Sequence, residues 1–157
     1  MSEPIVYLNG EFIHSQDAKV SVFDRGFLFG DGVYEVIPAY DGRLFQLPAH
    51  LDRLQHSLNG VRIANPYARS RWTAVLQELT RRTGRCDQSV YLQVTRGVAP
   101  TRTHAFPPQT VPTVFAMSTA TRTMDWQRRA RGARAITHDD IRWRRCDLKT
   151  TAMLANV

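Results

Sequence analysis

Residues 33–47, VYEVIPAYDGRLFQL, decide the fold. Two β-prone runs, 33–37 and 43–47, flank the pair Asp41-Gly42, which is typical of a tight hairpin turn because both residue types accept positive φ. The N-terminus repeats this arrangement, since residues 5–8 and 11–13 flank Asn9-Gly10. The sequence therefore predicts two β-hairpins in an antiparallel sheet.

Two amphipathic helices are expected to flank this sheet. The first begins at Pro48, which suits a first helical turn, and it repeats apolar residues every three or four positions at Leu51, Leu54, Leu58 and Val61. The second ends at Gly84 and carries the inner-face residues Trp72, Val75, Leu76 and Leu79. Alternating residues predict further strands at 89–97 and 113–117.

The pattern changes after residue 120. Residues 124–134 are irregular and basic, and residues 133–137 are predicted to form a short strand. The elements before this point predict an α+β domain over residues 1–120, built on an antiparallel sheet with two helices.

Composition excludes several classes of protein. The net charge of +7 comes from arginines scattered through the chain, without a long basic tract or a recognisable nucleic-acid-binding motif. No apolar run approaches the ~20 residues that span a bilayer. Cys86 and Cys146 lack a CxxC partner or nearby histidines, so we expect no disulfide and no metal. We expect a cytoplasmic protein that binds neither nucleic acid nor a membrane.

The 21 basic side chains include only two lysines, Lys19 and Lys149. Arginine keeps its proton in proteins, whereas a desolvated lysine can lose it, and only a neutral amine can attack a carbonyl carbon. Lys149 is thus the candidate nucleophile. The alternative is that both lysines are ordinary solvated surface residues.

Three motifs point to the same family. Residues 142–149, RWRRCDLK, resemble the lysine-bearing segment of the D-amino acid and branched-chain aminotransferases, and most of all the D-amino acid transaminases. Residues 24–35, DRGFLFGDGVYE, resemble the DRGxxFGDGVYE signature of the same family, and residues 50–54, HLDRL, resemble its HxDRL motif. The resemblance implies a fold-type IV enzyme that uses pyridoxal phosphate.

The resemblance also implies roles for individual residues. Lys149 would form the Schiff base with the cofactor and carry the proton to and from the substrate, and Arg53 would bind the cofactor phosphate. Tyr34 would help to hold the substrate carboxylate. Arg102 and His104, in the proline-punctuated loop 98–108, would bind that carboxylate across a homodimer interface. The alternatives are that Tyr34 is an ordinary aromatic of the core, that Arg53 is a solvated arginine on a helix, and that Arg102 and His104 are a solvated pair in a loop.

In the family a second, β-rich domain begins near residue 121. Residues 121–157 are therefore expected to be the incomplete start of the cofactor-binding domain that carries the lysine, since family members are roughly twice as long as these 157 residues. The missing part would hold the glutamate that pairs with the pyridine nitrogen.

The function implied is transamination between a D-alanine-like amino acid and a 2-oxo acid, giving pyruvate-like and D-glutamate-like products. Three alternatives stay open: an aminodeoxychorismate-lyase-like enzyme, a branched-chain aminotransferase-like enzyme, and an inactive fragment of such an enzyme.

Overall fold

The structure is a computed structural model that describes residues 3–84, 86–121, 125–140 and 142–154. Ile141 and residues 155–157, which belong to the lysine-bearing stretch of the sequence, lie outside the described residues. So do residues 122–124, next to the expected domain boundary.

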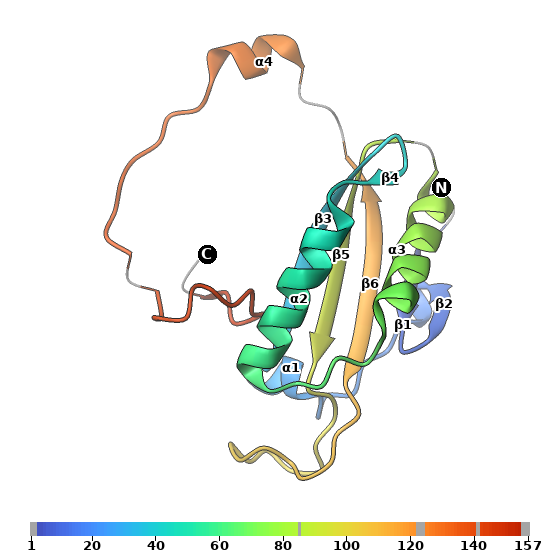
Figure 1. The fold of residues 1–157 in the computed structure, drawn as a ribbon, viewed down its shortest axis with the longest axis vertical. Helices are drawn as coiled ribbons and strands as arrows, with labels where there is room; N and C mark the ends of the chain where they lie inside the picture. Colours follow the sequence, from blue (N-terminus) through green and yellow to red (C-terminus); the bar gives the residue numbers. More distant parts are fainter. Residues whose placement is uncertain (1–2, 85, 122–124, 141, 155–157) are drawn as a thin grey trace.

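One antiparallel sheet forms the centre of the chain (Figure 1), in the order β2-β1-β6-β5-β3-β4. Its strands are β1 (Ile5–Leu8), β2 (Glu11–His14), β3 (Gly32–Tyr40), β4 (Arg43–Leu44), β5 (Gln88–Thr95) and β6 (Thr113–Ala120). The first hairpin turns at Asn9 and Gly10, whose φ angles are 49° and 112°. Both predicted hairpins and the antiparallel sheet are therefore confirmed.

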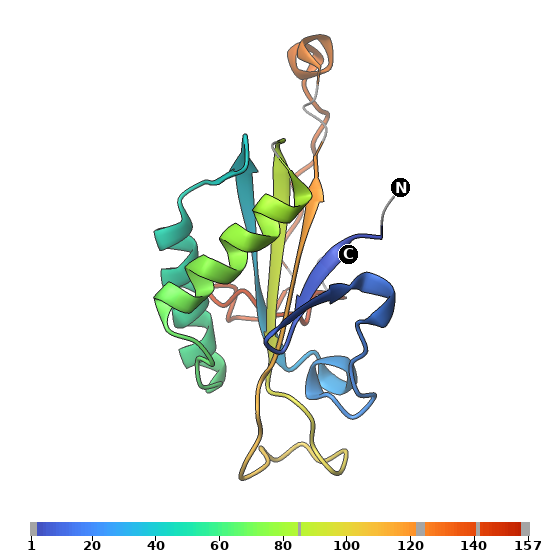
Figure 2. The same cartoon turned by 90° about the vertical axis from the view of Figure 1, so that its right-hand side faces the viewer.

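Helices α2 (Leu47–Val61) and α3 (Arg69–Thr83) pack on the same face of the sheet (Figure 2). The predicted stripes form the core between helices and strands, with Leu54, Leu58, Leu76 and Trp72 at most 1% exposed. Val61 packs only partly buried at the edge of this core. The sequence prediction of an α+β fold with two flanking helices is correct.

Three local predictions are wrong. The return strand expected at 43–47 stops at Leu44, because Gln46 takes a left-handed conformation (φ 50°) and α2 begins at the next residue. The irregular segment contains helix α4 (Trp126–Arg131), capped by the Asp125 side chain, which accepts a hydrogen bond from Arg128 N at 2.8 Å. Residues 133–137 are exposed and form no strand, since they pair with no strand in the described chain.

Two short helices complete the described elements, the 3₁₀ helix η1 (Ser15–Asp17) and helix α1 (Arg25–Phe29). After β6 the chain leaves the sheet, passes through α4 and returns beside α2 and the start of β3 (Figure 1). No helix in the described ranges has the length and apolar character to cross a membrane. The domain boundary at residues 120 and 121 stays a prediction.

Candidate functional site

The short β4 leaves one edge of β3 open, and the lysine-bearing segment fills it. Tyr34 N donates to Lys149 O at 3.0 Å, and Thr151 N donates to Gly32 O at 3.0 Å. Val33 and Thr150 form an isolated antiparallel bridge between these two hydrogen bonds. An unpaired strand edge offers a row of backbone donors and acceptors. Hydrogen bonds to this edge therefore fix the backbone of residue 149 in register with β3.

Helix α2 supports the same segment from the other side. Lys149 N donates to Ser57 Oγ at 3.1 Å, and Ser57 is fully buried. Leu148 is 6% exposed and packs against Gly60, where a Cβ atom would lie 2.8 Å from Leu148 Cδ1. Glycine at this position therefore lets the lysine segment approach the helix closely. We call Ser57, Gly60 and the edge of β3 the lysine seat.

Three of the predicted site residues, Tyr34, Arg53 and Lys149, line one cavity of about 250 Å³. Its other walls come from the lysine-bearing segment: Arg142, Trp143, Cys146, Asp147, Leu148, Thr150, Ala152 and Met153. Lys149 Nζ lies 3.9 Å from the centroid of the Tyr34 ring, which in turn stacks on Tyr91 at 5.7 Å. An amine over an aromatic face is held in place without an acidic partner.

Arg53 is oriented by a buried carboxylate. Its Nε and Nη2 donate to the two oxygens of Glu35 at 2.7 and 2.6 Å, and Glu35 has no exposed surface. His50 Nδ1 lies 2.9 Å from Glu35 Oε2, so it shares the same carboxylate. The hydrogen bonds to Glu35 raise the pKa of Arg53 above its ordinary value. Arg53 Nη1 has no acceptor within the described chain, and the side chain remains 48% exposed toward the cavity.

The cavity carries an excess of positive charge. Arg53, Arg142 and Lys149 line it, against the single carboxylate of Asp147. A hydrogen bond from Arg145 holds the pKa of Asp147 at about 2, although partial desolvation opposes the shift, and His56 adds a weaker contact. A cationic, aromatic cavity with a primary amine fits the phosphate, the ring and the aldehyde of pyridoxal phosphate.

The structure does not bring Arg102 and His104 into this cavity. Both are exposed in the loop between β5 and β6, and both rest on Phe29 at the end of α1: Arg102 Cζ lies 4.8 Å and the His104 ring 5.6 Å from its ring centroid. Within one chain, the proposed carboxylate pair and the lysine are separate.

Four residues of this arrangement, Glu35, His50, Ser57 and Gly60, were not predicted from the sequence. Glu35 could have been found from the sequence. Neighbouring residues of a strand point to opposite faces of the sheet, so Glu35 lies on the face opposite to Tyr34, which is the face that the helices cover. The contacts of Ser57 and Gly60 join positions about 90 residues apart, so no local pattern marks them. The described residues contain no cluster of three or more His, Cys, Asp or Glu side chains that could hold a metal.

Comparison with known proteins places the chain among aminotransferases. A family profile described as amino-transferase class IV matches residues 32–157. A D-alanine aminotransferase of Staphylococcus epidermidis is 40% identical over 152 residues, which are 97% of this chain and 54% of that protein. The chain thus spans about half the length of the curated relatives it matches.

Solved structures share the fold. The branched-chain amino acid aminotransferase of Escherichia coli superposes with a TM-score of 0.69 at 19% identity, over 76% of this chain and 42% of that one. A hypothetical aminotransferase from Mycobacterium tuberculosis, solved in its PLP-bound form, gives a TM-score of 0.63 at 23% identity, over 74% of this chain and 39% of that one.

Proposed function

Because this chain belongs to the class IV aminotransferase family, whose members depend on pyridoxal phosphate, we propose that it transfers an amino group between a D-amino acid and a 2-oxo acid. The preferred substrate is D-alanine or a close analogue, and the products are pyruvate and D-glutamate or their analogues. The observation that carries this proposal is the Lys149 amine over the Tyr34 ring in one cavity with the Glu35-oriented Arg53. The reaction would take place in the cytoplasm.

Three residues of the cavity, Arg53, Lys149 and Tyr34, have roles in this reaction. Arg53, held by Glu35 through Nε and Nη2, presents its remaining Nη1 to the cofactor phosphate. Bound pyridoxal phosphate supplies the electron sink that makes the α-hydrogen of an amino acid acidic. Lys149 would hold the cofactor covalently and would move a proton at the substrate α-carbon as general base and acid. Tyr34 fixes the direction from which the Lys149 amine approaches, and it would help to hold the substrate carboxylate.

The separate placement of Arg102 and His104 supports a shared active site. We infer that the chain acts as a homodimer in which this pair from one protomer binds the substrate α-carboxylate in the cavity of its partner. Such an arrangement is possible in a twofold dimer because each interface surface is used twice. The guanidinium of Arg102 suits a carboxylate because its planar fork can donate two parallel hydrogen bonds.

The first test is a transaminase assay with D-alanine and 2-oxoglutarate on the protein as its cells produce it, comparing the parent, Arg102→Ala and Arg43→Ala. Arg43 is an exposed arginine in β4, at the opposite end of β3 from Tyr34, so its loss should leave the rate unchanged. Arg102→Ala should lower kcat/KM for D-alanine by about a hundredfold, which corresponds to one lost charge-assisted contact of ~3 kcal/mol. A parent that ignores D-alanine, or an unaffected Arg102→Ala variant, would favour a lyase instead.

The shared site is tested by mixing two defective variants, Lys149→Ala and Arg102→Ala, after they have been dissociated and reassembled. If the pair acts in the partner's cavity, each mixed dimer contains one intact site, and random mixing restores about a quarter of the parent activity. No recovery above the separate variants would mean that Arg102 serves its own chain or none.

A further inference from the structure

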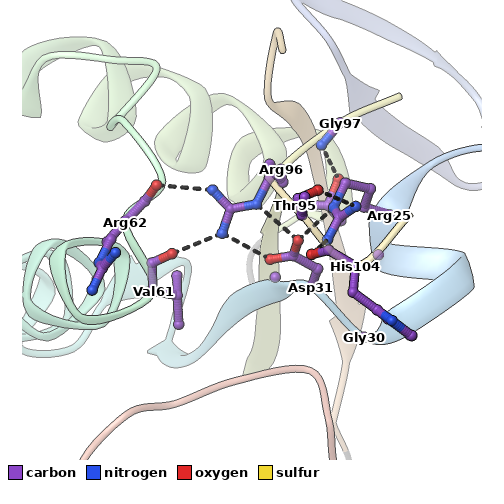
Figure 3. A network of polar contacts seen from close by, with 12 residues as sticks. Arg25, Gly30, Asp31, Val61, Arg62, Thr95, Arg96, Gly97 and His104 are labelled. Atoms are coloured by element: carbon purple, nitrogen blue, oxygen red, sulfur yellow. Dashed lines mark hydrogen bonds and ion pairs between the residues drawn. The ribbon is translucent and has the colours of Figure 1, made fainter. Parts of the chain in front are cut away.

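A buried ionic network surrounds Asp31, between the two glycines Gly30 and Gly32 (Figure 3). Asp31 Oδ2 accepts from Arg25 Nε at 2.7 Å and from Arg96 Nε at 2.8 Å, and Asp31 Oδ1 accepts from Arg96 Nη2 at 3.0 Å. Arg25 is 3% and Arg96 6% exposed. Two buried guanidiniums thus share one carboxylate, and the excess positive charge is costly unless the other N–H groups find acceptors.

The remaining donors of these arginines point to two different parts of the chain. Arg96 donates to the carbonyls of Val61 and Arg62 at 2.7 and 2.9 Å, at the C-terminal end of α2, where the helix dipole favours a cation. Arg25 instead donates to the loop between β5 and β6. Its Nη1 lies 2.7 Å from Thr103 O, and its Nη2 lies 3.4 Å from His104 O. Figure 3 shows His104 next to Arg25 on the side away from Arg62.

Phe29 joins the same arrangement through its ring. Arg25 Cζ lies 4.7 Å from the ring centroid, while Arg102 Cζ lies 4.8 Å from it. The His104 ring packs against Phe29 in a tilted geometry. The backbone of the loop therefore rests on Arg25, and the side chains of Arg102 and His104 rest on Phe29. Without these contacts, two exposed side chains on an irregular loop would sample many rotamers.

We propose that Arg25 and Phe29 are positioning residues that hold the loop so that Arg102 and His104 are presented together to the substrate carboxylate. This inference rests on the proposed function. Neither residue needs to touch the substrate. Arg25 acts through the carbonyls of residues 103 and 104, and it keeps its own orientation through Asp31. Pre-ordering the loop removes an entropy cost that substrate binding would otherwise have to meet.

The test uses Arg25→Lys, Phe29→Leu and the control Arg43→Lys. Arg25→Lys keeps the charge but loses the fork that reaches Asp31 and the loop together, and Phe29→Leu keeps apolar bulk without the ring. Trypsin cleavage after Arg102, followed by mass spectrometry, reports loop release without any need for activity. We expect faster cleavage after Arg102 in both variants and no change in the control, at temperatures where thermal melting shows each variant folded.

Kinetics supply the second readout. We expect the KM for D-alanine to rise about tenfold in both variants with kcat within about twofold of the parent, because the carboxylate pair is disordered while Lys149 is untouched. A fall in kcat at unchanged KM, or unchanged cleavage after Arg102, would overturn the inference. A parent without transaminase activity would refute the proposed function and the role in carboxylate binding. The trypsin result would still decide whether Arg25 and Phe29 hold the loop.

Discussion

Replacing Gly60 by alanine should loosen the lysine seat without unfolding the helix that carries it. An added Cβ would lie 2.8 Å from Leu148 Cδ1 and 3.2 Å from Cγ, and it would overlap Cδ2. Leu148 must therefore leave the position in which it is 6% exposed. Exposing a leucine costs about 1.5–3 kcal/mol, whereas Gly→Ala in a helix contributes at most about 1 kcal/mol.

The gain in helix propensity and the displacement of Leu148 are detected by different measurements. Helix propensity affects global unfolding, so the melting temperature should stay near that of the parent or rise slightly. The free-energy cost of exposing Leu148 affects only the local opening of the lysine seat. Opening of the seat exposes the amides of Tyr34 and Thr151, whose hydrogen bonds join β3 to the lysine segment. The opening constant should therefore rise about ten- to hundredfold, as 1.5–3 kcal/mol requires.

Native-state hydrogen exchange measures this opening directly. The amide of Leu92, in the central strand β5, serves as an internal reference that should not change. Asn59→Ala is the matched variant, since Asn59 is exposed in the same last turn of α2. It changes helix propensity and removes only an exposed hydrogen bond, which Gln55 Nε2 donates to Asn59 Oδ1 at 2.7 Å. Unchanged exchange at Tyr34 and Thr151 in Gly60→Ala would refute the close-approach argument.

Further predictions concern the seat, the loop and the buried network. Ser57→Ala removes the acceptor of the Lys149 N–H, and the loss of ~1 kcal/mol should raise the dissociation constant of pyridoxal phosphate about fivefold in a spectral titration. Gly97→Ala should lower the free energy of unfolding in urea by ~2 kcal/mol or more, because Gly97 has a φ of 92° and its Cβ would meet the carbonyl of Val111. Burial raises the pKa of Asp31, but its hydrogen bonds to two arginines outweigh this and leave the pKa below 3.8, so the stability it contributes is present above about pH 4 and lost as pH falls through the lowered value. Asp31→Asn should weaken the dependence of the melting temperature on pH in that acidic range, and an unchanged slope of melting temperature against pH would contradict this reasoning.

Local signals in the sequence were sufficient for most of the fold. The Asn9-Gly10 pair predicted a turn because few residues accept φ angles of 49° and 112° in succession. The stripe on α2 predicted its buried face, since Leu51, Leu54 and Leu58 follow the helical period. Where local propensity and tertiary packing disagree, packing decides: β4 ends early because the chain turns into α2 at Gln46.

The site was predictable only in part. Motif resemblance selected Lys149, Tyr34 and Arg53, and these three line one cavity. The network that joins Arg25 to Arg96 was not predictable. Arg25 lies six residues from Asp31, but Arg96 meets the same carboxylate across 65 residues and Arg25 reaches the Thr103 carbonyl across 78. Nineteen arginines populate this chain, and the sequence alone does not distinguish buried ones from solvated ones.

The central claim is that Lys149 is the residue that binds pyridoxal phosphate covalently, and the chain offers an internal control. Lys19 is exposed and is the only other lysine among the 157 residues. The protein is mixed with pyridoxal phosphate, reduced with borohydride, digested and mapped by mass spectrometry, alongside Lys149→Ala and Lys19→Ala. We expect a visible absorption band and a stable adduct on Lys149, both retained in Lys19→Ala and lost in Lys149→Ala. An adduct confined to Lys19 or the N-terminus, or a band that survives in Lys149→Ala, would contradict it.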